Sequence, residues 1–219
     1  ATSLDFQMAK ARVMVRFQRT NNRELHRYFA KEVSNGGNWQ ADAARYGQAL
    51  ALLDTKQYGA ARTLFTELDR RHPNNIFILD GLTDLDNAED KHSAAIARLK
   101  KAQQRLPNNQ VVMINLADSL LQAGQHQEAA TLLDNYLRRH PNNLLAWDLI
   151  AQAYRPLSDE SAFRRANAES AALRGRYDLA VEQMEIAANL TKDAMERARL
   201  GARLQQLRKQ QQAWEELRK

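Results

Sequence analysis

The sequence has little of what several protein classes require. It contains no cysteine, which excludes a disulfide framework, a zinc site with cysteine ligands and thiol catalysis. Aromatic residues make up only 7% of the 219 residues, and glycine and proline number 8 and 4. This composition disfavours a β-rich domain, and the abundant alanine and leucine favour helices. No apolar run approaches the roughly 20 residues that span a bilayer, so no membrane-spanning segment is predicted.

The formal net charge of +6 suggests an anionic partner such as nucleic acid or a membrane surface. The positive excess lies in residues 1–33 and 192–219, whereas residues 34–191 are slightly acidic. Aromatic residues that could stack on bases do not accompany the arginines, and no RNA-binding motif occurs, so we do not predict nucleic acid binding. The chain starts at Ala1 without an initiator methionine or a signal peptide, as expected of a processed product or a fragment.

An internal repeat of 34 residues organises the chain. Pro73, Pro107 and Pro141 are spaced by this period, and two asparagines follow each of them. Small residues recur in the same register, at Ala49, Thr83, Ala117 and Ala151 and at Ala61, Ala95 and Ala129. Proline cannot continue a helix, and asparagine is a favoured N-cap, so each Pro-Asn-Asn marks the turn between two helices.

This period and its residues resemble the tetratricopeptide repeat. Trp147, Ile150, Ala151 and Tyr154 are spaced like the start of that motif, and Ala61 precedes Phe65 as in its second half. The small residues allow two antiparallel helices to approach closely, and the large residue fills the space between hairpins. The sequence therefore predicts an all-α, tetratricopeptide-type α-solenoid of antiparallel helix hairpins, with a phase slip after residue 156 and a long C-terminal helix.

Four segments follow from the register. They are a degenerate N-terminal hairpin with a Gly-rich joint (1–38), a regular array (39–156), a phase-shifted hairpin (157–191) and a C-terminal capping helix (192–219). The predicted helices lie near residues 3–18, 22–33, 42–55, 58–71, 76–88, 92–105, 110–123, 126–139, 144–155, 159–173, 177–190 and 192–217. The helix near 159–173 is expected to pack in two hairpins, because the pattern restarts half a period late.

The first helix of each hairpin lines the concave groove in proteins with this repeat, as the resemblance implies. The candidate polypeptide-binding groove then consists of Tyr46, Leu50, Phe77, Asp80, Asp84, Ile114, Asp118, Asp148 and Gln152. Its four aspartates fit a basic or polar-apolar polypeptide, and they do not form the Lys-Asn-Arg clamp that grips acidic C-termini. The same aspartates could instead solvate an exposed helix face. A metal site made of all four is disfavoured because they are spread over three repeats.

Basic residues at the two ends form a second candidate surface. The candidate docking residues are Arg12, Arg16, Arg23, Arg27, Arg203 and Arg208. A solvated face or a surface that docks on another domain is the favoured interpretation. No metallopeptidase His-Glu-x-x-His, nucleophile elbow, P-loop or dinucleotide fingerprint occurs, so neither catalysis nor a cofactor is predicted for these residues.

The residues of the repeats are similar to those of one protein family. Residues 43–50, 115–125, 146–154 and 175–180 resemble the C-terminal tetratricopeptide region of periplasmic M48-family zinc metalloproteases, of the β-barrel assembly-enhancing type. The resemblance is close over residues 40–190 and looser outside them. It implies a periplasmic protein-protein interaction domain that is not itself an enzyme, since the zinc-binding peptidase domain of the family is missing here.

The resemblance also implies partners. The expected ones are polypeptides: the peptidase domain of the same protein, the outer-membrane β-barrel assembly machinery and the clients of that machinery, in assembly and quality control. Zinc is expected only in the peptidase domain. The alternative is a free-standing tetratricopeptide adaptor or scaffold that binds anionic partners through its basic ends.

Overall fold

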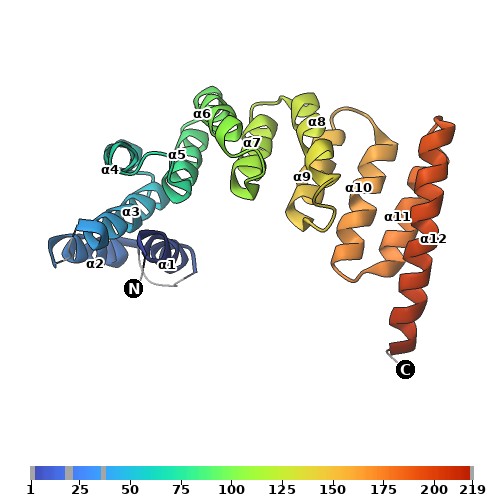
Figure 1. Cartoon of the computed structure of the whole chain (residues 1–219), viewed down its shortest axis with the longest axis horizontal. Coiled ribbons are helices and arrows are strands. Elements are labelled where there is room, and N and C mark those ends of the chain that lie inside the picture. The colour runs from blue at the N-terminus through green and yellow to red at the C-terminus, as the bar shows by residue number, and fades with distance from the viewer. Residues whose placement is uncertain (1–2, 18–21, 36–37, 218–219) are drawn as a thin grey trace. The chain divides into compact units, whose positions relative to one another are not determined.

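The fold is known from a computed structural model, which describes residues 3–17, 22–35 and 38–217; the side chains of residues 22, 23, 35 and 38 are outside this description. The described residues form twelve α-helices and no strand, as the sequence predicts (Figure 1). The helices are α1 Leu4–Phe17, α2 Asn22–Asn35, α3 Asn38–Asp54, α4 Tyr58–Arg71, α5 Ile76–Ala88, α6 His92–Arg105, α7 Gln110–Gln122, α8 His126–Leu137, α9 Leu144–Tyr154, α10 Glu160–Leu173, α11 Tyr177–Leu190 and α12 Ala194–Leu217.

The Pro-Asn-Asn segments form the turns between repeats. In each turn the second asparagine caps the following helix: Asn75 accepts hydrogen bonds from two backbone N–H groups of α5, and Asn109 and Asn143 each accept one from α7 and α9. These bonds satisfy N–H groups that have no partner within the helix. Asn74 has a φ of 68°, a conformation that asparagine tolerates better than most residues. The N-cap prediction is confirmed at all three turns.

The helices fall into two compact units, residues 1–115 and 116–219, with the boundary inside α7. In the N-terminal unit α3, α4, α5 and α6 pack in chain order. Phe65 of α4 is fully buried, and it lies so close to Gly81 of α5 that a Cβ there would clash with its ring. The predicted filling of the space between hairpins by Phe65 is thus confirmed, and Gly81 is what allows the close approach.

Helices α1 and α2 do not repeat the hairpin arrangement that the sequence suggests for them. Both pack against α3, and α1 also contacts α5, whereas the two make few direct contacts with each other among the described residues. Met8, Ala11 and Val15 of α1 are buried. Part of the predicted Gly-rich joint, Gly36 and Gly37, lies outside the described residues.

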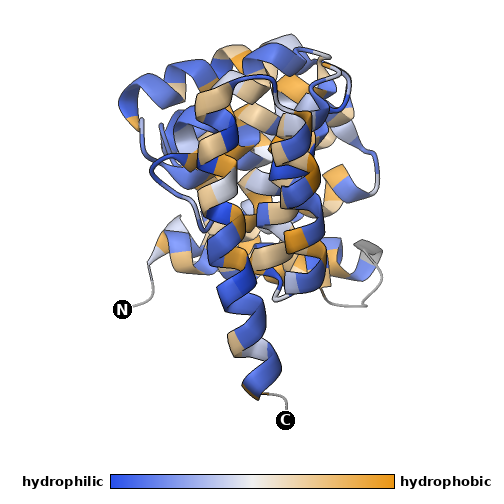
Figure 2. Ribbon diagram, turned by 90° about the vertical axis from the view of Figure 1, so that its right-hand side faces the viewer, coloured by the Kyte–Doolittle hydropathy of each residue, from blue (hydrophilic) through white to orange (hydrophobic). Residues whose placement is uncertain are grey.

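In the C-terminal unit α8 to α12 pack in chain order. Helix α10 packs against both α9 and α11, which is the double role that the phase slip predicts. The last two helices bury Met184, Leu200 and Leu207, so α12 covers α11 as a terminal cap. Figure 2 shows that the last turns of α12, near the C-terminus, are mostly hydrophilic.

Candidate functional site

The predicted groove of the N-terminal unit is covered by α1. Arg12 of α1 forms an ion pair with Asp80, lies 3.4 Å from Asp84 and donates a hydrogen bond of 3.2 Å to the hydroxyl of Tyr46. Arg16, one turn further along α1, donates to Asp84 at 2.8 Å. Two predicted docking arginines therefore pair with two predicted groove aspartates, and the groove positions are contacted by the chain itself.

Burial of the other groove positions follows from this packing. Tyr46 and Leu50 are buried, and Phe77 is half-buried with its ring edge-on to Tyr46. Asp80 is buried and also accepts a hydrogen bond of 2.6 Å from Asn115. Polypeptide binding at the groove stays a prediction, and a ligand on Tyr46 or Asp80 would have to displace α1.

The remaining groove positions lie elsewhere. Ile114, at the end of the N-terminal unit, is buried. In the C-terminal unit Asp118 accepts a hydrogen bond from Gln122, and Gln152 is exposed. Asp148 pairs with Arg174 at 2.7 Å and accepts a hydrogen bond from Ser170. Burial alone would raise the pKa of Asp148, but the hydrogen bonds from Arg174 and Ser170 hold it below its ordinary value.

The other predicted docking arginines differ in their surroundings. Arg203 of α12 binds both carboxylate oxygens of Glu169, at 2.8 and 2.7 Å, and Arg208 lies 3.1 Å from Glu185 on the surface. Arg27 is exposed, and the side chain of Arg23 lies outside the described residues. A role in docking remains a prediction for all six.

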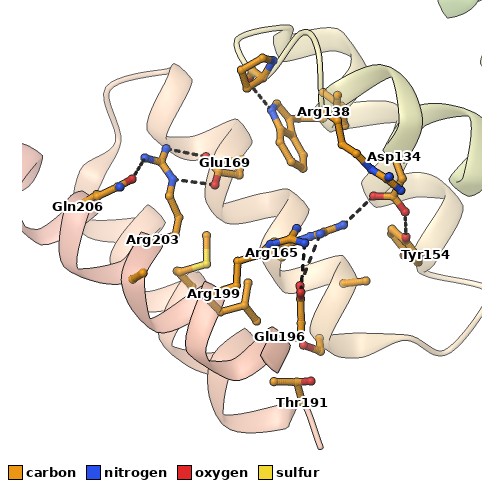
Figure 3. A pocket seen from close by; sticks show the side chains of 18 of the residues that line it. Asp134, Arg138, Tyr154, Arg165, Glu169, Thr191, Glu196, Arg199, Arg203 and Gln206 are labelled. Atoms are coloured by element: carbon orange, nitrogen blue, oxygen red, sulfur yellow. Dashed lines mark hydrogen bonds and ion pairs between the residues drawn. The ribbon is translucent and has the colours of Figure 1, made fainter. Parts of the chain in front are cut away.

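An open cavity of about 910 Å³ lies within the C-terminal unit (Figure 3). This volume is at the upper end of the roughly 300–1,000 Å³ that is usual for ligand pockets. Side chains of α8 to α12 and their connections line it. Its buried apolar residues are Leu137, Trp147, Met184 and Leu200.

Ion pairs cross the cavity wall. Arg165 of α10 donates to Asp134 at 2.8 Å and lies 3.6 Å from Glu196 of α12, and Figure 3 shows its side chain between these two carboxylates. Asp134 also accepts a hydrogen bond from the hydroxyl of Tyr154. Burial raises the pKa of Tyr154 well above its ordinary value, and Asp134 raises it further, so this phenol stays protonated as a donor.

Among the residues that line this cavity, the sequence suggested a binding or docking role only for Arg203, because the repeat pattern points to the groove helices. Trp147 did belong to the repeat motif, and its indole N–H donates to the carbonyl of Pro141 at 2.7 Å. This bond holds the ring beside the Pro-Asn-Asn turn, at the cavity wall. The charged residues Asp134, Arg138 and Arg165 carry no motif by which spacing could have found them.

The cavity offers binding surface without the usual groups of a metal centre. Among residues 3–17, 22–35 and 38–217, no cluster of three or more histidine, aspartate or glutamate side chains is arranged to hold a metal ion. Within the same ranges, no helix combines the length and the apolar character that crossing a bilayer requires. An apolar floor with charged walls is typical of a site that binds by shape, burial and hydrogen bonding.

Family comparison agrees with the register and the fold. Residues 43–75 and 87–153 match the tetratricopeptide repeat. The chain contains tetratricopeptide repeats. Its fold resembles the crystal structure of YrrB, a "TPR protein with an unusual peptide-binding site", with a TM-score of 0.55 over 84% of this chain and 93% of that one. The two share only 15% sequence identity, so this likeness concerns the fold alone.

The tetratricopeptide-repeat domain has relatives of higher identity. It is 36% identical over 212 residues to the β-barrel assembly-enhancing protease of Escherichia coli K12, covering 96% of this chain and 43% of that protein. The protease of the same name from Yersinia pestis is 34% identical over 210 residues, which is 95% of this chain and 43% of that protein. The domain thus spans less than half of these relatives and resembles their repeat region. Tetratricopeptide proteins as a class mediate protein-protein interaction.

Proposed function

We propose that this domain recruits polypeptides for a periplasmic zinc metalloprotease that acts in the assembly and quality control of outer-membrane β-barrel proteins. The observation that carries the proposal is the open cavity of the C-terminal unit, with buried Leu137, Trp147 and Leu200 behind a charged rim. It is combined with the 36% identity to a protease whose name states the β-barrel connection. Partners on this proposal are the barrel-assembly machinery, its clients and the peptidase domain.

The domain contributes binding and not peptide hydrolysis on this proposal. On this proposal the zinc and the catalytic groups lie in a part of the protein outside this chain, which spans 43% of the length of its relatives. The described residues hold no cluster suited to zinc, so no catalytic step is assigned to them. On this proposal the exposed apolar surface of the cavity supplies affinity for a polypeptide, and the flanking polar groups supply orientation.

A blocking variant tests the proposal. Ala202 lines the cavity and is exposed on α12, so Ala202→Trp should fill the opening while leaving the helix intact. Ala213→Trp is the matched control, since Ala213 is exposed on the same helix and does not line the cavity. The measurement is retention, on the immobilised chain, of purified barrel-assembly machinery and of an unfolded outer-membrane β-barrel protein. Retention by the chain and the control, but not by Ala202→Trp, is expected; no retention by any of the three contradicts the proposal.

The alternative, a scaffold for anionic partners, has less support. Arg12 and Arg16 pair with aspartates of the same unit, and Arg203 binds Glu169, so part of the basic charge at the ends is already compensated. A phosphate-driven complex would lose affinity steeply as salt rises. Binding of the chain to DNA or RNA at low salt, with that dependence, would favour the alternative.

A further inference from the structure

We infer that the cavity of the C-terminal unit selects extended polypeptide segments in which apolar side chains alternate with acidic ones. The inference rests on the proposed function and adds the chemical class of the segment. It follows from three features of the cavity: an apolar floor, carboxylates that are already paired, and arginine N–H groups at the rim that have room for an acceptor.

The floor of the cavity accepts apolar side chains. Leu137, Met184 and Leu200 lie beneath the cavity and are almost completely buried, so they offer a ligand little surface, and Trp147 is 9% exposed. Leu173, which also lines the cavity, is 37% exposed, so it provides most of the apolar surface that these large side chains offer to a ligand. Each apolar side chain that enters removes this surface and its own from water, which is favourable.

Two carboxylates of the cavity wall already accept hydrogen bonds from neighbouring side chains. Asp134 accepts from Tyr154 and Arg165, and both oxygens of Glu169 accept from Arg203. A basic ligand would have to break these pairs before it could bind them. Removing one partner of a half-buried ion pair leaves the other charge desolvated, so such an exchange is disfavoured.

Asp159 and Glu196 are occupied in the same way. Asp159 caps α10 by accepting from Ala162, and Glu196 lies between the guanidinium groups of Arg165 and Arg199. Every carboxylate that lines the cavity therefore has a partner in the chain. The acidic groove that the sequence suggested does not continue into this cavity.

Two arginines that line the cavity have guanidinium N–H donors available to a ligand. The side chain of Arg199 is 69% exposed, and its contact with Glu196 is 3.4 Å long. Arg138, at the end of α8, is exposed and makes no side-chain hydrogen bond or ion pair with any other described residue. A guanidinium has five N–H donors in a planar fork that matches a carboxylate. The rim is therefore complementary to added carboxylates.

The spacing of these features favours an extended segment. Arg138 follows the last residue of α8 and Arg199 lies in α12, on different parts of the lining, so two separate acidic groups are better matched than one chain terminus. In an extended chain successive side chains point to opposite sides, so apolar residues can face the floor while acidic residues face the rim. The strands of transmembrane β-barrels have this period-two pattern of apolar and polar residues.

Short fluorescent peptides test the inference with the full 219-residue chain. The probe alternates leucine with glutamate and is capped at both ends. Its comparison peptides have glutamine or lysine in place of glutamate, and a further one has glutamine throughout and a free C-terminal carboxylate. The glutamate probe is expected to bind at least about tenfold more tightly than the glutamine and lysine peptides, the change expected for lost charge-assisted hydrogen bonds.

Variants locate the binding. Arg138→Gln combined with Arg199→Gln is expected to remove the preference for glutamate while leaving the glutamine peptide unaffected. Arg208→Gln combined with Lys209→Gln is the matched control, because it removes two charges from α12 outside the cavity lining. Leu173→Gln should weaken all the peptides alike, since it changes only the apolar surface. Circular dichroism melts show whether each variant keeps its fold.

The outcomes separate the inference from the proposed function. Equal binding of the glutamate and glutamine peptides that Ala202→Trp abolishes would overturn the inference and leave polypeptide binding intact. Tighter binding of the lysine peptide than of the glutamate probe would also overturn the inference. So would equally tight binding of the glutamine peptide that has a free C-terminal carboxylate. Binding of no peptide would count against both. A glutamate preference that survives the Arg138 and Arg199 double variant would place recognition elsewhere and overturn it.

Discussion

The two units of this chain are built from the same kind of helix hairpin, yet they treat their lining side chains differently. In the N-terminal unit α1 covers α3 and α5, so that Arg12 reaches both Tyr46 and Asp80. In the C-terminal unit the lining of α8 to α12 leaves a cavity of about 910 Å³. In the N-terminal unit a helix of the chain covers the lining side chains, whereas the C-terminal unit has an open surface that a ligand could contact. Repeat register alone therefore does not reveal which lining side chains of this chain are covered and which are open.

Truncation of Phe65 should have the largest effect. Phe65 is fully buried against Gly81, so Phe65→Ala is expected to cost about 3–5 kcal/mol of unfolding free energy in the N-terminal unit. Because every residue that lines the cavity belongs to the other unit, peptide binding there should persist in conditions where Phe65→Ala is still folded. Urea denaturation and peptide titration measure the two effects. An equal loss of stability and of peptide binding would contradict the claim that the cavity depends only on the C-terminal unit.

Removal of the α1 anchor should have the next largest effect. Arg12→Gln leaves Asp80 buried without its ion partner, so we expect a loss of about 2–3 kcal/mol, below the range for fully buried pairs since Arg12 is partly exposed. Hydrogen exchange of α1 should accelerate, because Arg12 holds it to α3 and α5. Arg208→Gln is the control: its pair with Glu185 is half-exposed, and about 0–1 kcal/mol is expected. Similar costs for the two variants would contradict this account of α1.

Acid should weaken the N-terminal unit through Asp42. Burial alone would raise the pKa of Asp42, but hydrogen bonds from His72, Arg45 and Arg71 hold it below the ordinary value of 3.8. The stability that this carboxylate contributes is therefore fully present above its unfolded pKa and is lost as the pH falls through the lower folded pKa. Asp42→Asn should be less stable than the parent at neutral pH and should lose less below pH 3.8. Denaturation midpoints against pH measure this, and an unchanged acid dependence in the variant would exclude Asp42 as its source.

The helix caps should give the smallest effects, with one in each unit. Asn75→Ala and Asn143→Ala each remove an N-cap, at a cost of about 1 kcal/mol. Asn75 also donates to Asp5 of α1 at 2.7 Å, so its loss should additionally loosen α1, which the loss of Asn143 has no means to do. Thermal melts together with hydrogen exchange of α1 compare the two. Equal hydrogen exchange of α1 in both variants would contradict a role of the Asn75–Asp5 hydrogen bond in holding α1.

The local structure was predictable to a large extent, because each repeat carries its own signals. The bounds predicted for α4, α5, α6 and α11 agree with the structure at both ends, and the phase slip gave the double packing of α10. Proline and asparagine fix these boundaries through the backbone, within a few residues of where they occur. The Arg12–Asp80 pair joins residues 68 positions apart, and no local pattern indicates such a contact.

The sequence by itself determined the helices, their caps, the repeat register and the family to which the repeats are similar. The tertiary structure alone decided that α1 covers the predicted groove positions of the N-terminal unit and that Asp80 and Asp84 pair with arginines of α1. It also decided that a cavity opens among α8 to α12 with Arg138 and Arg199 at its rim. The physical reason is that helix formation and capping depend on neighbours in the chain. Packing, ion pairing and cavities depend instead on which distant side chains the folded chain brings together.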